Sequence, residues 1–314
     1  MTPLELNRYV KEQAALAGFD ACGVARAEPI GRREYLRRWL AEGRAGSMGY
    51  LHRHAGLRGD PRGLLAGAQS AVVVALLYNQ PLPLTEQDEK VRGRVAMYAW
   101  GDDYHDVMRD KLGKMRDQMG ADVGINFATR ICVDTAPIIE REMAETAGVG
   151  WIGKNTMVLS RELGSFFFLG VLLTTLDIAA DEPQADHCGT CTACLEACPT
   201  QAFPVAYEMN ASRCISYLTI EHRGDISKPY QRMMGDWVFG CDVCQEVCPF
   251  NRKAPVMRET RFAVRRPGPR PPLDELLAWG EAGYRANMKG SAMLRATSGM
   301  LRRNVRITEA NAHL

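Results

Sequence analysis

The sequence predicts an α/β (α+β) N-terminal domain, followed by a small cysteine-rich domain and a short, helical, basic C-terminal segment. Helix and strand patterns alternate through residue 180, seven of the ten cysteines fall in two short runs, and residues 250–314 carry a surplus of positive charge. The expected domains are residues 1–180, 181–252 and 253–314. A composition of 46% apolar and 24% charged residues is ordinary for a globular enzyme and excludes disordered, collagen-like and coiled-coil chains.

Local patterns predict the elements of the first 180 residues. Thr2-Pro3-Leu4-Glu5 is a capping box with proline at the first helical position, which predicts a helix to about Ala17. Residues 71–78 are almost all apolar, as expected of a strand that is buried on both faces. Residues 43–63 are rich in glycine and arginine and are expected to form a loop. The other expected elements are strands at 19–25, 94–100, 130–133 and 165–176, and helices at 32–42, 103–119 and 137–147.

The two cysteine runs predict iron–sulfur ligation. The first has the bacterial ferredoxin spacing C-x2-C-x2-C-x3-C-P, in which the fourth thiolate ligates the other cluster of a two-cluster protein. The second run has Val238 where the pattern begins with cysteine, and Cys214 is the nearby thiol left to replace it. The predicted ligands are Cys188, Cys191, Cys194 and Cys248 for cluster one, and Cys198, Cys214, Cys241 and Cys244 for cluster two.

A structural zinc site is the alternative interpretation of the cysteine runs, because two C-x2-C pairs also suit tetrahedral zinc. Zinc does not account for the two Cys-Pro endings or for the crossed spacing, so the sequence favours a ferredoxin-like domain with two 4Fe–4S clusters. Cys22 and Cys132 are expected to be ordinary buried thiols.

The charge is distributed unevenly along the chain. The net charge is 39 − 37 = +2, whereas residues 250–314 carry 13 Lys/Arg against 5 Asp/Glu, so residues 1–249 sum to −6. This asymmetry indicates either a C-terminal surface that meets a polyanion or a solvated basic tail. No apolar run approaches the about 18 residues of a membrane span, and the N-terminus shows no export signal. We expect a cytoplasmic protein with no membrane association.

Five stretches resemble the epoxyqueuosine reductases: GRVAMYAWGDDYHDVM, VDTAPIIEREMAETAGVGWIGKN, HCGTCTACLEACPT, RCISYLTIEHRG and FGCDVCQEVCPFN. The resemblance runs from about Gly93 to Asn251, with a weaker continuation upstream at LRGDP. It implies reduction of the epoxide of epoxyqueuosine, at the wobble position of tRNA, to queuosine. It also implies a monomer that binds cobalamin as cob(II)alamin, with two 4Fe–4S clusters that pass on electrons from an external donor.

Asp134 is the candidate catalytic residue. It follows the expected strand 130–133 and precedes the helix expected from Pro137, where α/β folds often place site residues. Opening an epoxide leaves an alkoxide, which a protonated carboxyl could neutralise, and an enclosed site would raise the pKa of that carboxyl. The resemblance implies this role for Asp134. The nearby sequence D-Y-H resembles the start of a cobalt-ligating motif, but Met108 replaces its glycine, so we interpret His105 as structural.

Other candidate contacts come from the resemblance. The candidate cofactor-binding residues are Arg58, Met97, Asp134, Lys154, Asn155, Ser216, Cys241 and Asp242. The candidate tRNA-binding residues are Arg141, His222, Arg223 and Lys228. The basic stretch 252–306 would hold stem phosphates, while the target nucleoside leaves its stack to reach a buried cofactor.

Two other functions remain open on the sequence. One is a corrinoid iron–sulfur reductase similar to the reductive dehalogenases, which usually carry a twin-arginine signal that this N-terminus lacks. The other is a non-catalytic iron–sulfur protein for electron transfer or RNA binding. That protein would bind no corrinoid and would keep its function after Asp134→Asn.

Overall fold

A four-stranded antiparallel sheet organises the N-terminal half of the chain. The computed structural model describes residues 1–83 and 89–313. The sheet order is β1-β2-β7-β4, and each neighbouring pair is antiparallel. Its strands are β1 (Ala21–Arg26), β2 (Ser70–Leu77), β4 (Thr129–Cys132) and β7 (Phe167–Thr174). The predicted mixed α/β fold is therefore confirmed, with antiparallel pairing of its main sheet.

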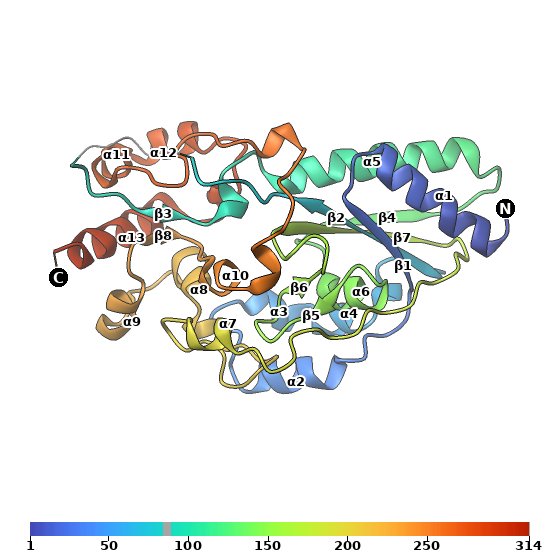
Figure 1. Ribbon diagram of the computed structural model, residues 1–314, viewed down its shortest axis with the longest axis horizontal. Helices are drawn as coiled ribbons and strands as arrows, with labels where there is room; N and C mark the ends of the chain where they lie inside the picture. The colour runs from blue at the N-terminus through green and yellow to red at the C-terminus, as the bar shows by residue number, and fades with distance from the viewer. Residues whose placement is uncertain (84–88, 314) are drawn as a thin grey trace.

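Helices cover both faces of this sheet, as Figure 1 shows. They are α1 (Pro3–Leu16) and α5 (Tyr104–Asp122) on one face, and α6 (Glu140–Thr146) on the other. Successive residues of β2 enter different clusters, Val72, Val74 and Leu76 on the α5 side and Val73 and Ala75 on the α6 side. The strand is buried along its whole length, as its apolar run predicted.

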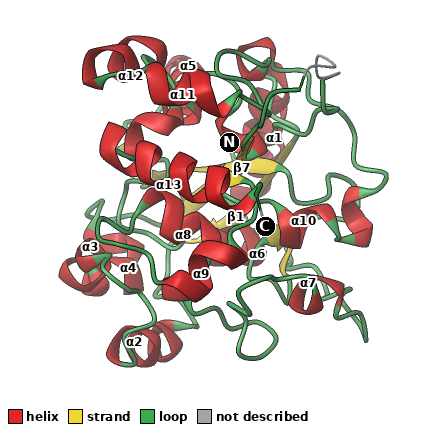
Figure 2. Cartoon of the chain, turned by 90° about the vertical axis from the view of Figure 1, so that its left-hand side faces the viewer, coloured by secondary structure: helices red, strands yellow, loops and turns green. Residues whose placement is uncertain are grey.

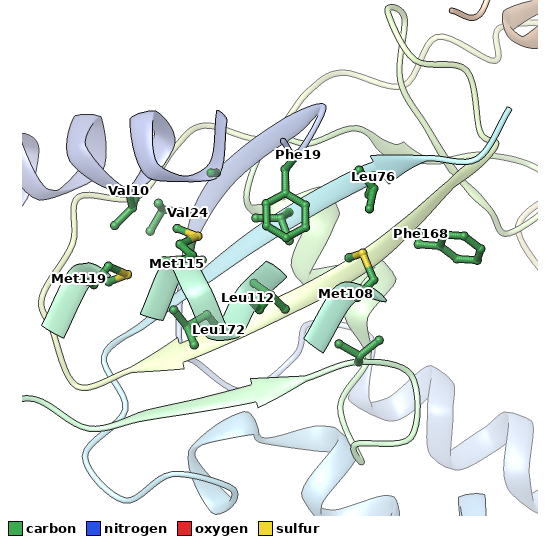
Figure 3. Close-up of a cluster of buried hydrophobic side chains, with 14 of the residues drawn as sticks. Val10, Phe19, Val24, Leu76, Met108, Leu112, Met115, Met119, Phe168 and Leu172 are labelled. Carbon is green, nitrogen blue, oxygen red and sulfur yellow. The ribbon is translucent and has the colours of Figure 1, made fainter. Parts of the chain in front are cut away.

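The α5 side of the sheet holds the larger apolar core (Figure 3). Met108, Leu112, Met115 and Met119 recur at helical spacing along α5 and share one cluster with Phe168 and Leu172 of β7. The start of α1 carries the predicted capping box, because Thr2 Oγ1 accepts a hydrogen bond from the Glu5 amide and Glu5 Oε2 accepts one from the Thr2 amide. These features set the long helices against the sheet.

Two expected elements differ in the structure. Residues 43–63, expected as a loop, contain α3 (Gly49–Arg53), α4 (Ala55–Gly59) and the short 3-10 helix η1 (Pro61–Gly63), while α2 (Arg33–Ala41) precedes them. Of the strand expected at 94–100, only β3 (Arg94–Val95) is extended, and η2 (Met97–Ala99) follows it. The Trp100 indole donates a 2.7 Å hydrogen bond to the Val95 carbonyl, which turns the chain back on itself.

A second sheet has two strands: β3, from the first half of the chain, pairs in parallel with β8 (Trp237–Phe239), from the second half. The other strands are β5 (Trp151–Ile152) and β6 (Val158–Leu159). Short helices surround the cysteines: α7 (Ala193–Glu196), η3 (Ala211–Arg213), α8 (Ile215–Ile220), α9 (Lys228–Met233), α10 (Val243–Glu246) and η4 (Pro249–Asn251). The C-terminal elements are η5 (Thr260–Phe262), α11 (Leu273–Ala278), α12 (Glu281–Asn287), η6 (Ala292–Arg295) and α13 (Ser298–Asn311).

The C-terminal segment packs onto the rest of the molecule, and Figure 2 shows α11, α12 and α13 stacked beside α8. Val238 and Phe239 of β8 share a core with Leu301 and Val305 of α13. The buried Asn304 amide donates 2.9 Å hydrogen bonds to the carbonyls of Thr219 and Val238, at the centre of this contact. The domain boundaries at 180 and 252 remain a prediction. Within the described residues, no helix is long and apolar enough to span a bilayer.

Ion pairs neutralise part of the C-terminal positive charge. Several arginines bind carboxylates of other segments: Arg258 to Asp20 (3.0 Å), Arg261 to Asp110 (2.8 Å), Arg265 to Asp102 (2.8 Å), Arg270 to Asp236 (3.1 Å) and Arg295 to Glu221 (2.8 Å). The charge surplus thus also serves to attach this segment to the acidic remainder of the chain.

Candidate active site

Asp134 lies directly after β4 in an unusual backbone conformation. Its φ is +51°, in the left-handed region that aspartate tolerates better than most non-glycine residues. The Asp134 amide donates a 2.6 Å hydrogen bond to Oε1 of Glu140, the first residue of α6, which holds the turn. The Asp134 side chain is 58% exposed, so a substrate can reach it.

His105 joins Asp134 to a second carboxylate. Its Nε2 lies 3.2 Å from Asp134 Oδ2, and its Nδ1 lies 2.7 Å from Asp103 Oδ1. Burial opposes the charge of the imidazole, but the hydrogen bonds to Asp103 and Asp134 outweigh it and raise the pKa of His105 to about 9. The sequence favoured a structural role for His105, whereas the structure places it against the candidate catalytic residue.

The proton in this pair sits on histidine. Partial desolvation raises the pKa of Asp134, but the hydrogen bond and charge of His105 more than offset it, so the pKa is lowered. The expectation of a raised pKa is therefore wrong for this structure, because it left out the cationic neighbour. At neutral pH the site contains an aspartate anion beside an imidazolium.

Aromatic rings fix the position of the imidazole. The Tyr104 ring stacks on His105 at 4.1 Å and on Phe168 of β7 at 4.3 Å. Tyr98 packs edge-on against Tyr104 at 6.2 Å.

Glu140 is a second carboxyl close to Asp134. Burial and the charge of Asp134 raise the pKa of Glu140 to about 8, so it holds a proton at neutral pH.

Arg58 has an unsatisfied donor beside this site. Its side chain is buried, and Nη1 donates a 3.1 Å hydrogen bond to the Ile138 carbonyl. Among residues 1–83 and 89–313, nothing accepts a hydrogen bond from its Nε. Burial lowers the pKa of Arg58, and the nearby Tyr50 and Asp134 act in the opposite direction. Because buried donors are almost always paired, this atom is suited to an acceptor on a bound molecule.

Met97 and Asp242 come together at the start of η2. The buried Asp242 Oδ2 accepts a 2.7 Å hydrogen bond from the Met97 amide, and burial raises the pKa of this carboxyl to about 7. Burial raises the pKa of Tyr98, and Asp134 and Asp242 are close enough for the charges of both carboxylates to raise it further. Tyr98 is therefore near both Asp134 and Asp242, which adjoins Cys241 of the second cysteine run.

Lys154 and Asn155 hold the cysteine loops. Lys154 Nζ donates hydrogen bonds to the carbonyls of Gly189 (2.6 Å) and Cys191 (2.9 Å) in the first run. Asn155 Nδ2 donates a 3.2 Å hydrogen bond to the Cys244 carbonyl in the second run. These two predicted residues lie on the cysteine loops.

The eight clustered thiols fall into two interacting groups. Cys194 is close enough to interact electrostatically with Cys188, Cys191 and Cys248. Cys244 interacts in the same way with Cys198, Cys214 and Cys241. In the described ranges, no three His, Cys, Asp or Glu side chains converge on one point as ligands of a single ion. In a 4Fe–4S cluster the four thiolates bind different irons, so such convergence is not required.

Polar donors surround these sulfurs. The Ala202 amide donates a 3.3 Å hydrogen bond to Cys198 Sγ, and Ser216 hydrogen-bonds the Cys214 thiol through its amide and hydroxyl. The remaining two thiols differ, since burial raises the pKa of Cys22 to about 12 and that of Cys132 to about 11. This is typical of unreactive cysteines.

The candidate tRNA contacts separate into two places. Arg141 Nη1 donates a 2.9 Å hydrogen bond to the Thr156 carbonyl. The positive charge of Arg141 also helps to lower the pKa of Asp134. His222 and Arg223 line a surface cavity of about 440 Å³, whereas Lys228 begins α9. Seven further residues line this cavity, among them Tyr50 and Arg53, which the sequence did not point to, and Arg295, which lies in the basic stretch 252–306. They are brought together by the fold and carry no local motif.

Two groups of four cysteines together with a site of hydrogen-bonded titratable side chains are typical of an iron–sulfur oxidoreductase. The 4Fe-4S double cluster binding domain family matches residues 187–251, and the family described as Epoxyqueuosine reductase QueG, DUF1730 matches residues 58–135. The epoxyqueuosine reductase of Xanthomonas campestris pv. campestris is 38% identical over 313 residues, which cover 99% of this chain and 88% of that protein. The chain belongs to the epoxyqueuosine reductase family, and the resemblance seen in the sequence is confirmed.

Solved structures agree with this assignment. The epoxyqueuosine reductase of Bacillus subtilis, with its catalytic loop swung out of the active site, has a TM-score of 0.90 at 28% identity, over 98% of this chain and 82% of that one. An epoxyqueuosine reductase with an epoxyqueuosine-modified tRNA-Tyr stem loop has a TM-score of 0.88 at 30% identity, over 98% and 81%. The reductive dehalogenase NpRdhA shares the fold alone, with a TM-score of 0.51 at 15% identity over 98% and 37%.

Proposed function

We propose that this chain reduces the epoxide of epoxyqueuosine, carried in the anticodon loop of tRNA, to the alkene of queuosine. The reaction consumes two electrons and two protons and releases one water. The observation that carries the proposal is the position of Tyr98, which is close to both Asp134 and Asp242. Asp134, which would supply a proton, and the second cysteine run, which would carry electrons, therefore belong to one site. Family membership and the tRNA stem loop bound by a relative support the choice of substrate.

Two 4Fe–4S clusters would carry the electrons from an external one-electron donor. The proposed ligands are Cys188, Cys191, Cys194 and Cys248 for cluster one, and Cys198, Cys214, Cys241 and Cys244 for cluster two. The chemistry of the two thiol groups supports this division, because each group offers four sulfurs and nearby amide donors. Cys241 adjoins Asp242, so cluster two would be the one nearer to the proton site.

Cobalamin would supply a low-valent cobalt centre that breaks a carbon–oxygen bond of the epoxide. The unpartnered Arg58 Nε is the structural observation that fits such a ligand, whose amide and phosphate groups accept hydrogen bonds. Met97 and Ser216 would add contacts at the rim, because Met97 hydrogen-bonds Asp242 next to Cys241 and Ser216 hydrogen-bonds Cys214. The likeness to a reductive dehalogenase concerns the fold alone, and the choice of substrate does not use it.

Asp134 would deliver the proton to the oxygen of the opening epoxide. The proton rests on His105, 3.2 Å away, and passes through the Asp134 carboxylate to the developing alkoxide. Asp103, 2.7 Å from Nδ1, holds the imidazole in position during this transfer. Glu140 keeps another proton next to the same turn, available for the loss of water.

The tRNA would lie across the positively charged rim of the site. Arg141 is placed near Asp134, while His222 and Arg223 flank a cavity that a neighbouring nucleotide could enter. Arg295 lies 5.4 Å from the centre of the Tyr50 ring, so the same cavity offers both a flat aromatic surface and positive charge. Single-stranded RNA is bound by this combination in other proteins.

An anaerobic turnover assay tests the proposed function. Protein with reconstituted clusters receives tRNA that contains epoxyqueuosine, a strong reductant and cobalamin, and the nucleosides are then separated and weighed by mass spectrometry. We expect the loss of one oxygen atom, dependent on cobalamin and abolished by Asp134→Asn.

Asp106→Asn is the matched control, because Asp106 lies on α5 with a 71% exposed side chain, which makes no hydrogen bond or ion pair with His105 or Asp134 among the described residues. Its activity should stay within a factor of about two of the wild type. If Asp134→Asn converts the substrate at the wild-type rate, the proposed proton path is wrong. If clusters and cobalamin bind but no oxygen is lost, the substrate is wrong.

A further inference from the structure

Trp151 is a buried residue with an unsatisfied hydrogen-bond donor. It lies in β5, its side chain is 1% exposed, and its Nε1 has no hydrogen-bond partner in the part of the chain that the structure describes. A buried indole N–H normally finds an acceptor, because an unpaired donor inside a protein is costly. The position of this atom therefore indicates an acceptor that comes within hydrogen-bond distance when a cofactor is bound next to it.

The surroundings of Trp151 identify the acceptor as a cysteine sulfur of the first thiol group. The indole packs in one small cluster with Cys188, Cys248 and Phe250, two of which are proposed ligands of cluster one. Two rings hold it edge-on, His187 at 5.0 Å and 80° and Phe250 at 5.0 Å and 77°, so its orientation is fixed. The indole N–H acts on the Cys188 thiol from one side, and the backbone amide of Lys154 acts on it as well.

We propose that the Trp151 indole donates an N–H···S hydrogen bond to the Cys188 sulfur of cluster one and raises the reduction potential of that cluster. When cluster one accepts one electron from the external one-electron donor, negative charge accumulates on its sulfurs. A donor aimed at one of these sulfurs stabilises the reduced form more than the oxidised form. Cys191 of the same cluster is exposed, so cluster one is also the one that an external donor reaches. This inference rests on the proposed ligand set of cluster one.

Replacing the donor without removing the ring tests the proposal. Trp151→Phe keeps an aromatic side chain in the small cluster but lacks the N–H. An anaerobic redox titration, followed by electron paramagnetic resonance with dithionite as reductant, reports both clusters in the same sample. At a fixed potential, we expect about tenfold less reduced cluster one, equal to a fall of ~59 mV for a one-electron couple. Cluster two should not change.

Phe250→Leu is the control for packing. Phe250 packs edge-on against the indole, so its shortening disturbs the same small cluster without removing a side-chain donor. Its cluster-one potential should stay at the wild-type value. An unchanged potential in Trp151→Phe overturns the proposal, and so does an equal shift of both clusters.

A second substitution keeps the test open if Trp151→Phe does not take up iron. Benzothienylalanine at position 151 has the shape of tryptophan, with sulfur in place of the N–H. A lowered cluster-one potential supports the hydrogen bond, and a wild-type potential overturns it. The ligand sets are tested independently by the iron content of Cys188→Ala for cluster one and of Cys214→Ala for cluster two. An unchanged potential in a protein that binds both clusters therefore rejects the hydrogen bond alone.

Discussion

The Nε2 atom of His105 lies 3.2 Å from Oδ2 of Asp134, and this contact keeps the proton on the imidazole while the carboxylate faces the open side of the site. The pair is coupled, because each partner lies within hydrogen-bond reach of the other and of Asp103 or Tyr104. Substitutions at His105 therefore change the protonation of Asp134.

His105→Gln should reduce turnover and move its pH dependence. In the wild type, His105 supplies the proton until the pH rises through about 9, so the rate should fall above that pH. Without the cation, the pKa of Asp134 rises but stays below that of the imidazole, so the fall in rate should begin at lower pH. We expect a loss of about 100-fold at neutral pH, typical of a missing acid–base group. Turnover measured from pH 6 to 10 checks both points, and an unshifted profile contradicts them.

The same contact should make folding stability depend on pH. The pKa of His105 is about 9 in the folded chain and 6.5 in the ordinary side chain, so the folded state binds an extra proton between these values. The stabilisation is complete below about pH 6.5 and is lost as the pH rises through about 9. Urea unfolding of the wild type and of His105→Gln should differ more at pH 6 than at pH 10. A difference that grows with pH would contradict this assignment.

Cys214→Ala should remove one cluster. Cys214 is the thiol that completes the second group, so its loss should lower the bound iron from about eight to about four atoms per chain. Cys22→Ala is the control, because Cys22 interacts with Lys11 and Asp181 and lies outside both groups. Iron analysis and the absorbance of the reconstituted protein decide the outcome. Unchanged iron in Cys214→Ala would refute the crossed ligand sets.

Arg58→Gln should weaken the binding of cobalamin. The substitution removes the buried Nε–H that has no partner among the described residues, and we expect the Kd to rise about tenfold. Arg62→Gln is a suitable control, because Arg62 is half-exposed and already pairs with Asp60 at 2.7 Å. Spectroscopic titration of the cluster-loaded protein with cobalamin measures both. Equal affinities for wild type and Arg58→Gln would place the cofactor elsewhere.

Arg223→Ala should weaken the binding of tRNA with little dependence on its sequence. Arg223 is exposed at the edge of the cavity, where its charge can neutralise a phosphate. The slope of log K against log salt should fall by about 0.7–0.9, the change expected for one phosphate contact. Arg116→Ala is the control, since Arg116 lies at the surface of α5 and pairs with Asp117. If the slope does not change, Arg223 does not contact the tRNA.

Local chemistry made much of the fold predictable. The capping box at Thr2 and the apolar run of β2 each depend on residues that are close together in the sequence. The predicted helix and the predicted buried strand are both present. The pairing of β3 with β8 was not predictable, because it joins Arg94 to Trp237 and depends on the packing of the whole second half. The short helices α3 and α4 were missed since glycine and arginine dominate that stretch.

The candidate site was predictable where residue type alone indicates chemistry. The cysteine spacing indicated iron–sulfur ligands, and Asp134 was singled out by its place after β4 together with the family resemblance, so their roles stay predictions. The part played by His105 was missed, since its contact depends on the left-handed turn at Asp134, which no local pattern announces. The contribution of Tyr50 and Arg53 to the cavity beside His222 was missed for a similar reason, because they are far from His222 in the sequence.

The crossed grouping of the cysteines sets the order in which the protein can mature. Cys198 leaves the ribosome well before Cys241 and Cys244, and Cys188 well before Cys248, so neither thiol group is complete until most of the chain has been made. With the ligand sets proposed above, iron delivery would follow the synthesis of both cysteine runs, and it would require a fold that brings these distant segments together. Because metal binding and folding then share one equilibrium, a cell short of iron should accumulate this protein as a protease-sensitive precursor.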